Sequence, residues 1–211
     1  KTLISETGGW VPFTMRVDTK PFADVRVRQA MRLIVDRQEM IDQANLFNET
    51  NDTVIYNTPV AAFYCPTRRS PAIDGSAAKS DYAGNGGDGQ SAYNGTLIRR
   101  SCKLAINFSD VRDGTSNTLL IGEKQTNLKN FGGSGGDNEP WVNSGWDEDH
   151  IRNGAIANSP RPDTAHPVEP PAFWSQRFGS AHVDAFNGVM TDGSVRGFAY
   201  NIDAEIFRRI C

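Results

Sequence analysis

Residues 178–198 read Phe-Gly-Ser-Ala-His-Val-Asp-Ala-Phe-Asn-Gly-Val-Met-Thr-Asp-Gly-Ser-Val-Arg-Gly-Phe, and this stretch decides the fold class. Apolar runs at 186–190 and 195–200 flank the turn Thr191-Asp192-Gly193-Ser194. An Asp-Gly pair supplies the positive backbone angles that a tight turn between antiparallel strands requires. The stretch therefore predicts a β-hairpin near the end of the chain.

Four further short apolar runs precede the hairpin, and Gly, Asp, Asn and Pro separate them. They lie at 54–56, 60–64, 104–108 and 118–121. Short runs bounded by turn residues are typical of strands. We expect them to pair with the hairpin in one antiparallel sheet, and we expect one short helix at 203–210. Residues 70–95 and 130–171 lack such runs and predict long loops.

The front of the chain predicts one helix. Asp24 can cap a helix that runs to about Gln43, because apolar residues recur there at three- and four-residue steps. These residues are Val27, Ala30, Met31, Ile34 and Ile41. The predicted fold class is α+β, with the N-terminal helix packed on the antiparallel sheet and long loops between the strands.

Four motifs occur in order along the chain. They are Phe63-Tyr64-Cys65-Pro66, Asp81-Tyr82-Ala83-Gly84-Asn85-Gly86-Gly87, the segment from Asp113-Gly114-Thr115-Ser116-Asn117 to Gly122-Glu123, and the Phe-Gly-Ser-x-His and Asp-Gly-Ser-Val-Arg elements of residues 178–196. In these motifs and their order the chain resembles a prepilin-like family, the domain of unknown function 1559. The resemblance spans residues 44–211. It implies a pilin-like globular domain, an extracytoplasmic location in the periplasm or at the cell surface, and other envelope or pilin-like proteins as partners.

Residues 10–43 instead resemble a fragment of the family 5 periplasmic oligopeptide-binding proteins, through residues 21–30 and the pair Asp36-Arg37. About 40 residues are too few to form a two-lobed cleft or an independent core. We therefore divide the chain into an N-terminal helical segment, 1–43, and a pilin-like β-rich domain, 44–211. The long apolar helix that starts a type IV pilin is not seen, so we expect no filament assembly by the usual route.

Composition excludes several classes of protein. The chain has 211 residues, of which 38% are hydrophobic, enough for one packed domain with an appendage. The net charge is −3 and the basic residues are dispersed, so no positive patch is expected that would attract nucleic acid. No apolar run approaches the roughly 20 residues that span a bilayer, and no signal peptide is visible. We expect no membrane span and no nucleic-acid partner.

The cysteines, Cys65, Cys102 and Cys211, are too widely spaced for a zinc site built from clustered ligand pairs. In an oxidising compartment, a disulfide is the more natural use of two of them, and we expect it between Cys65 and Cys102. Three ordinary thiols are the alternative. Cys211 is terminal and is expected to be free.

Ser180, His182 and Asp184 alternate, so on a strand their side chains would share one face and gather a nucleophile, a base and an orienting acid. Neighbours on one face lie roughly 6.5 Å apart at Cα, and the Gly-x-Ser-x-Gly elbow of hydrolases is absent. The alternative is a polar strand end in which His182 bonds neighbouring polar groups.

Glu123 follows an apolar strand, where a carboxylate is costly unless it is paired. The candidate partners are Arg177, Arg196 and His182. A buried structural ion pair is favoured over an acid catalyst.

An acidic loop, Asp147-Glu148-Asp149-His150, lies among Trp141, Trp146 and Trp174. The tryptophans could stack on carbohydrate, with Asp147 and Glu148 as the acid and base of a glycosidase. The alternative is a solvated loop beside aromatic caps over the sheet edge.

Asp81, Asn85 and Asp88 are spaced through a glycine-rich loop and could surround a Ca²⁺ ion, which prefers oxygen ligands. The spacing does not match the EF-hand, and a solvated glycine loop is the alternative. No other cofactor is indicated.

These observations favour a non-catalytic, pseudopilin-like structural module outside the cytoplasm. One alternative is a hydrolase, either an esterase or a glycosidase, which would use the His182 region or the Asp147 and Glu148 loop. The other is a solute-binding module, which only the front fragment suggests.

Overall fold

The computed structural model describes residues 56–89, 91–99, 106–133, 135–142, 146–165 and 175–211. The predicted helix at 24–43 and its packing on the sheet lie outside these residues, as do Val54 and Ile55 of the first predicted strand. The described elements follow in chain order. They are η1 (Ala61–Phe63), β1 (Ile73–Asp74), β2 (Ala77–Ala78), β3 (Tyr82–Asn85), η2 (Phe108–Asp110), β4 (Leu119–Glu123), β5 (Ile151–Arg152), η3 (Ile156–Asn158), β6 (Ala185–Met190), β7 (Val195–Ala199) and α4 (Ala204–Ile210).

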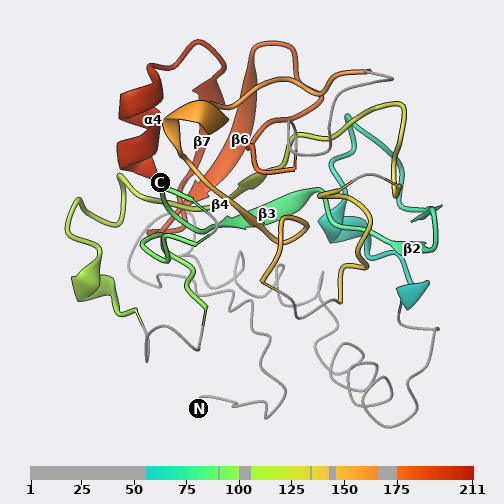
Figure 1. Cartoon of the computed structure of the whole chain (residues 1–211), viewed down its shortest axis with the longest axis horizontal. Coiled ribbons are helices and arrows are strands. Elements are labelled where there is room, and N and C mark those ends of the chain that lie inside the picture. Colours follow the sequence, from blue (N-terminus) through green and yellow to red (C-terminus); the bar gives the residue numbers. More distant parts are fainter. Residues whose placement is uncertain (1–55, 90, 100–105, 134, 143–145, 166–174) are drawn as a thin grey trace, which may run out of the picture.

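Five strands form one sheet in the order β5-β3-β4-β6-β7. The pairings β3–β4, β4–β6 and β6–β7 are antiparallel, whereas β3 and β5 run parallel, so the sheet is mixed rather than purely antiparallel. β1 and β2 form a separate two-stranded sheet. In Figure 1, β6, β7 and α4 gather at one end of the described fold, and long loops surround β3 and β4.

The predicted hairpin is confirmed. β6 and β7 pair directly, with Phe186 opposite Phe198. Gly193 adopts a φ of 84°, the left-handed conformation that this turn requires. Met190 N donates to Ser194 O at 2.8 Å and closes the turn. The strand predicted at 118–121 is confirmed as β4, and the closing helix as α4.

Other expectations from the sequence are wrong. Of residues 60–64, Ala61–Phe63 form the 3-10 helix η1 rather than a strand, because Phe63 N donates to Val60 O at 2.9 Å and turns the chain before Pro66. Phe108 begins η2, although residues 104 and 105 lie outside the description. The predicted loops at 70–95 and 130–171 contain β3 and β5, two strands of the main sheet. β3 contains Gly84, and its apolar residues are too few to be seen as a run.

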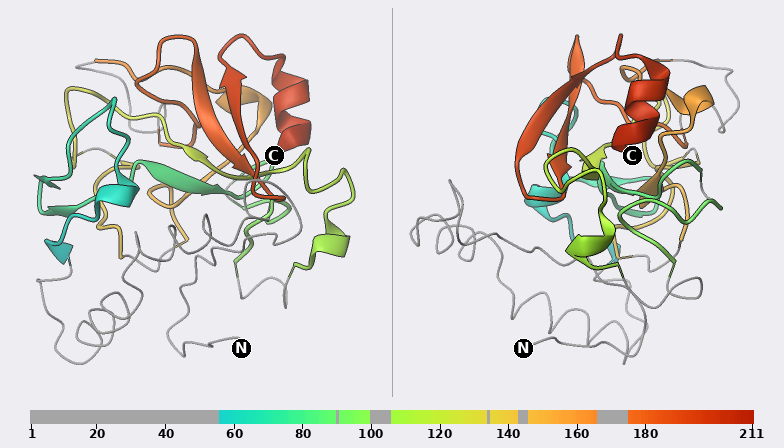
Figure 2. Two further views of the ribbon diagram at one scale, coloured as in Figure 1. Left: turned by 180° about the vertical axis from the view of Figure 1, so that it is seen from behind. Right: turned by 90° about the vertical axis from the view of Figure 1, so that its left-hand side faces the viewer.

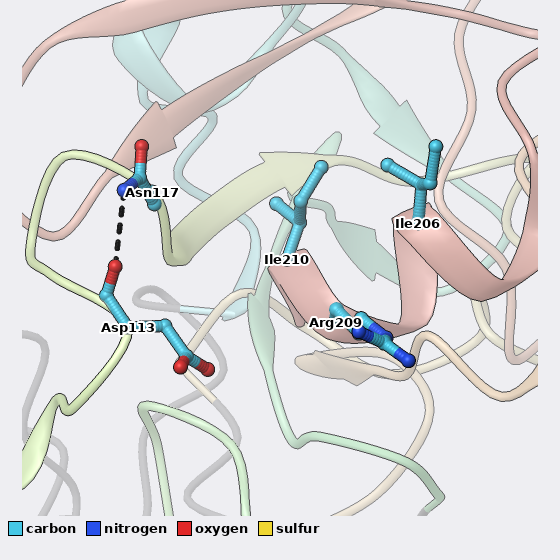
Figure 3. Close-up of a pocket in the computed structure, with 5 residues that line it drawn as sticks. All are labelled: Asp113, Asn117, Ile206, Arg209 and Ile210. Carbon is cyan, nitrogen blue, oxygen red and sulfur yellow. Dashed lines mark hydrogen bonds between the residues drawn. The ribbon is translucent and has the colours of Figure 1, made fainter.

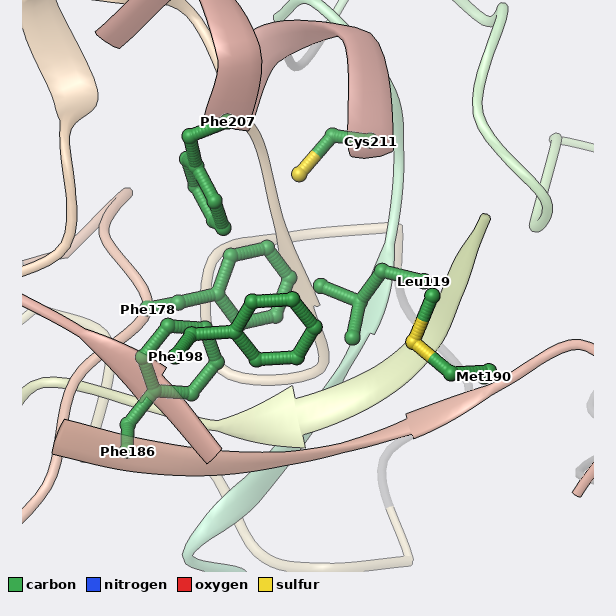
Figure 4. Close-up of a cluster of buried hydrophobic side chains, with 7 residues drawn as sticks. All are labelled: Leu119, Phe178, Phe186, Met190, Phe198, Phe207 and Cys211. Atoms are coloured by element: carbon green, nitrogen blue, oxygen red, sulfur yellow. The ribbon is translucent and has the colours of Figure 1, made fainter. Parts of the chain in front are cut away.

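An apolar core fills the space between α4 and the sheet (Figure 4). Phe207 of α4 turns its ring edge-on to Phe178, Phe186 and Phe198, with centroids 5.9–6.3 Å away. Edge-to-face contacts of this kind add to the free energy of area burial. The buried members of the core are Leu119, Phe178, Phe186, Met190, Phe198, Phe207 and Cys211.

Two local features place α4 on the core. Asp203 caps the helix, since its Oδ1 accepts bonds from the backbone N–H groups of Glu205 and Ile206 at 2.9 and 3.0 Å. On the sheet, Gly122 leaves room for aromatic rings, because a Cβ there would lie 2.8 Å from the ring of Phe178. Figure 2 shows α4 against β6 and β7 from two further directions. Among the described residues, no helix combines the length and apolarity needed to cross a bilayer.

Candidate functional site

Three residues from distant parts of the chain meet at one end of β4. Cys65 lies in the loop after η1, Glu123 is the last residue of β4, and His182 lies in the bend before β6. His182 Nε2 lies 3.3 Å from Glu123 Oε1 and 3.8 Å from Cys65 Sγ. A potential ligand atom from each of the three lies within 4.8 Å of the other two. We call this group the Cys-Glu-His cluster.

Two members of the cluster are buried and the third is partly exposed to solvent. Cys65 and Glu123 are 2% and 1% exposed, whereas the side chain of His182 is 32% exposed. Burial, assisted by a hydrogen bond to Glu123, raises the pKa of the Cys65 thiol. Burial also raises the pKa of the neighbouring Tyr82 to about 12. The negative charges that Cys65 and Glu123 carry when they are ionised add to that effect. The cluster therefore contains a protonated thiol near neutral pH. Of the partners predicted for Glu123, His182 lies 3.3 Å away, between Nε2 and Oε1.

Hydrogen bonds from outside fix each member of the cluster. Glu123 Oε2 accepts from Asn187 N at 2.7 Å, and Cys65 N donates to Asp81 Oδ2 at 2.8 Å. His182 N donates to Ser180 Oγ at 3.1 Å. These bonds occupy backbone atoms and one carboxylate oxygen, so the thiol, the second carboxylate oxygen and the imidazole remain directed at one another.

Ser180, His182 and Asp184 do not form the alternating strand that the sequence suggests. Residues 181–184 are bends, and β6 begins at Ala185. Ser180 is fully buried, and its hydroxyl bonds Ala185 O at 3.1 Å and the Tyr200 hydroxyl at 2.9 Å. Asp184 is exposed. The serine hydroxyl therefore stabilises the bend and does not point at His182 as a nucleophile.

The acidic loop is held by its own hydrogen bonds. Asp147 Oδ1 accepts from Asp149 N at 3.0 Å and lies 3.5 Å from His150 Nδ1. Burial acts to raise the pKa of Asp147, but the hydrogen bond and charge of His150 outweigh it and lower the pKa. A carboxyl held ionised is unsuited to the role of general acid. Glu148 beside it is half-buried.

The tryptophans near this loop pack on aromatic neighbours. Trp141 lies 5.2 Å from Phe63 between ring centroids and donates its indole N–H to Thr58 O at 2.9 Å. Trp146 lies 5.6 Å from Tyr93. Trp174 lies outside the described residues. The two described rings therefore pack on other aromatic side chains.

The predicted calcium ligands have different partners. Asp81 is fully buried and pairs with Arg68 and Arg69. Asn85 donates to Leu119 O and to Cys211 O, while Asp88 pairs with Arg208 at 3.2 Å. The structure thus directs the three side chains to different contacts. Calcium binding by these residues stays a prediction.

Of the two cysteines in the predicted disulfide, the structure describes only Cys65. Cys65 is a buried free thiol in the Cys-Glu-His cluster, and Cys102 lies outside the described residues. Cys211 is also free, and burial raises the pKa of its thiol. It belongs to the apolar core beneath α4.

A surface pocket lies at the opposite end of β4 from the cluster. Figure 3 shows the loop residues Asp113 and Asn117 facing Ile206, Arg209 and Ile210 of α4. Asn117 donates to Asp113 O at 3.0 Å, which closes the turn before β4. Arg209 pairs with Glu205 of its own helix at 2.9 Å. The amide of Asn117 and the guanidinium of Arg209 are thus engaged in local structure.

A comparison with protein families identifies the chain. The model of a family described as "Protein of unknown function (DUF1559)" matches residues 34–205. The chain belongs to the DUF1559 family. No curated protein and no solved structure matches it. The family match begins before residue 44, where we predict the domain boundary, and so includes part of the predicted helix at 24–43.

The motifs that suggested DUF1559 supply all three members of the cluster. Cys65 belongs to Phe63-Tyr64-Cys65-Pro66, Glu123 ends the segment that begins at Asp113, and His182 ends Phe-Gly-Ser-x-His. They are separated by 58 and 59 positions in the printed sequence, since 123 − 65 = 58 and 182 − 123 = 59. The fold therefore brings separate motifs of this DUF1559 chain to one place.

A second group of residues in the DUF1559 chain escaped the sequence analysis, which considered the basic residues only as dispersed charges. The two side chains are 0% and 7% exposed. Arg68 binds Asp163 through two bonds of 2.6 and 3.2 Å, and Arg69 binds Asp137 through two bonds of 2.8 Å. Both also contact Asp81. We call these five residues the arginine network.

The charges of the arginine network offset much of the effect of burial, although at Asp163 burial still outweighs Arg68 and raises the pKa. Desolvation acts to lower the pKa of Arg68, but the charges of Asp163 and Asp81 outweigh it and raise the pKa. Asp137 shows the converse, because Lys124 and Arg69 overcome the effect of burial and lower its pKa to about 2. Such paired geometry is what permits ions in a protein interior. In the sequence, Arg68 and Arg69 follow Cys65-Pro66-Thr67 with nothing nearby that indicates their burial.

Proposed function

We propose that this chain is a non-catalytic, pseudopilin-like structural module that acts outside the cytoplasm. One observation carries the non-catalytic part of the proposal. The hydroxyl of Ser180, the nucleophile that the sequence offers next to His182, is fully buried and bonded to Ala185 O and Tyr200. Membership of DUF1559 and the motifs that resemble prepilin-like proteins support the pseudopilin-like part.

The geometry around Cys65 also disfavours a thiol hydrolase. In a catalytic triad, one ring nitrogen of the histidine contacts the nucleophile and the other contacts the carboxylate. Here the same atom, Nε2 of His182, faces both Cys65 and Glu123. The thiol is almost fully buried and its pKa is raised, whereas a catalytic cysteine needs a lowered pKa and an approach for substrate.

The test of the non-catalytic role is a hydrolysis assay with the purified full chain. Ester, peptide and glycoside substrates are offered to the unmodified protein and to the variants His182→Ala and Glu148→Ala. We expect no turnover above the background that the variants share. Turnover that one folded variant loses would contradict the proposal and locate an active site.

The location and the assembly state require separate measurements. Protease treatment of intact cells of the natural host should degrade the chain while a cytoplasmic marker survives. Size-exclusion chromatography with light scattering of the purified chain should give a monomer or a small assembly. Protection equal to that of the cytoplasmic marker, or a large ordered polymer in solution, would contradict these two parts of the proposal.

A further inference from the structure

Two of the distances between ligand atoms of the Cys-Glu-His cluster are close to those around a tetrahedral metal ion, and all three ligand atoms lie within 4.8 Å of one another. Zinc bonds of about 2.3 Å to sulfur and about 2.0–2.1 Å to nitrogen and oxygen place neighbouring ligand atoms about 3.3–3.6 Å apart. In the structure, Cys65 Sγ and His182 Nε2 are 3.8 Å apart, and His182 Nε2 and Glu123 Oε1 are 3.3 Å apart. We propose that Cys65, Glu123 and His182 bind one Zn²⁺ ion.

The direction of the side chains supports a shared ion. Nε2 of His182 faces both the thiol and the carboxylate, so the three ligand atoms form one compact group rather than a relay from one residue to the next. A compact group of a sulfur, a nitrogen and an oxygen atom is the arrangement that a central cation requires. It also explains why the histidine turns one nitrogen towards both acidic groups.

The chemistry of the donors selects zinc among the common divalent ions. Zn²⁺ accepts thiolate, imidazole and carboxylate ligands together, whereas Ca²⁺ and Mg²⁺ take oxygen ligands. When the ion binds, the Cys65 thiol would release its proton to solvent, and the resulting thiolate and the Glu123 carboxylate would balance the double positive charge of the ion. Cys65 and Glu123 are almost fully buried, so this balance avoids an uncompensated charge in the interior.

The surroundings hold the ligands in position before an ion arrives. Asn187 N binds Oε2 of Glu123 and leaves Oε1 directed towards His182. Asp81, itself fixed by two arginines, binds the backbone of Cys65. Supporting hydrogen bonds of this kind orient metal ligands and increase affinity.

Because His182 is partly exposed, an ion could enter from solvent on that side, and a water molecule could serve as its fourth ligand. With three protein ligands, a tetrahedral zinc ion retains one position for water. The ion would tie the loop after η1 to the end of β4 and to the bend before β6. This role is independent of the proposed structural function, because it concerns what the cluster binds and not what the chain assembles with.

The decisive experiment measures zinc binding by the full chain, freed of any affinity tag, reduced, and stripped of metal with a chelator. Competition against a chromophoric chelator gives the affinity, and elemental analysis gives the stoichiometry. We expect one Zn²⁺ per chain. Cys65→Ser and His182→Ala should each weaken binding at least about 100-fold, since loss of a supporting residue alone costs about 10–100-fold.

Matched variants control for the change of residue type. Cys102→Ser removes another thiol, and His150→Ala removes a histidine that also lies beside a carboxylate, Asp147. Both should bind Zn²⁺ as the unmodified chain does. Equal loss of binding in His150→Ala and His182→Ala would overturn the assignment to the Cys-Glu-His cluster.

A measurement on the unmodified chain keeps the proposal testable if the variants fail to fold. Co²⁺ in place of Zn²⁺ should produce the visible absorption of a tetrahedral site and a thiolate-to-metal charge-transfer band in the near ultraviolet. Absence of both bands at saturating Co²⁺ would overturn the proposal. So would a reduced chain that takes up no Zn²⁺, or a native chain in which Cys65 is held in a disulfide with Cys102.

Discussion

The apolar core beneath α4 and the arginine network stabilise two parts of one sheet by opposite means. The core joins β4, β6 and α4 through phenylalanine rings packed edge to face. The arginine network joins the loop after η1 to Asp81, before β3, and to Asp137 and Asp163 in the later loops. Its charged groups are almost completely buried. Short regular elements are thus held by burial of apolar area, and long irregular loops by directed ionic bonds.

The difference follows from what each part of the chain can bury. Strands and helices satisfy their own backbone polar groups, so their side chains can be apolar. A loop leaves backbone carbonyls that need donors, and a guanidinium supplies five. Arg68 accordingly bonds Lys124 O at 2.6 Å as well as its carboxylate partners. Arg152 likewise donates to Gly136 O at 2.8 Å.

The largest effect is expected from breaking the arginine network at its most buried member. Arg68→Met removes the charge that compensates Asp163 and should lower the free energy of unfolding by about 3–5 kcal/mol, because a buried carboxylate is left without its partner. Urea denaturation followed by circular dichroism measures this loss. Arg196→Met, an exposed substitution on β7, is the control and should change the stability little. A tolerated Arg68→Met would mean that the apolar core alone holds the fold.

A somewhat smaller effect is expected from the apolar side of the comparison. Phe207→Ala removes the ring that contacts Phe178, Phe186 and Phe198, and should cost about 3 kcal/mol. The value lies at the lower end for phenylalanine because α4 is a single short helix that can shift towards the cavity. In Phe207→Ala, amide hydrogen exchange should become faster in α4. In Arg68→Met, exchange should instead become faster in the loops. The same pattern in both variants would mean that the two regions unfold as one unit.

The smallest effect is expected from pH. The pKa of Asp137 in the folded chain is about 2, below its ordinary value of 3.8, because Lys124 and Arg69 outweigh burial. A lowered folded-state pKa gives stability that is present above pH 4 and is lost as the pH falls through about 2. The loss is on the order of 2 kcal/mol for a shift of this size.

Denaturation at pH 4 and at pH 2 tests this expectation with Asp137→Asn. The variant should be less stable than the unmodified chain at pH 4 and should lose less stability on acidification. Asp184→Asn alters an exposed carboxylate and should follow the unmodified chain. An unchanged pH dependence in Asp137→Asn would show that other carboxylates of the arginine network carry the acid sensitivity.

The sequence predicted the parts of the fold that are encoded locally. The Asp192-Gly193 turn, the strands on either side, β4 and the capped helix α4 each depend on residues within a few positions of one another. β3 and β5 were missed because Tyr82–Asn85 is rich in small residues and Ile151–Arg152 is only two residues long. Such strands exist because neighbouring strands pair with them, and their own residues do not indicate them.

The candidate site was predicted residue by residue and not as a group. The sequence analysis selected Cys65, Glu123 and His182, and it named His182 among the partners of Glu123. It placed Cys65 in a disulfide and dismissed zinc because the cysteines are widely spaced. That argument holds for sites built from local cysteine pairs, whereas this cluster takes one ligand from each of three segments.

By itself, the sequence determined the family of this protein, its terminal hairpin and helix, and the residue types that chemistry would need, because motifs, periodicity and turn residues act over short distances along the chain. Only the tertiary structure decided that Arg68 and Arg69 are buried ions and that Cys65, Glu123 and His182 meet. Both outcomes depend on strand order and loop paths, which are set by the packing of the whole chain and leave no local pattern in the sequence.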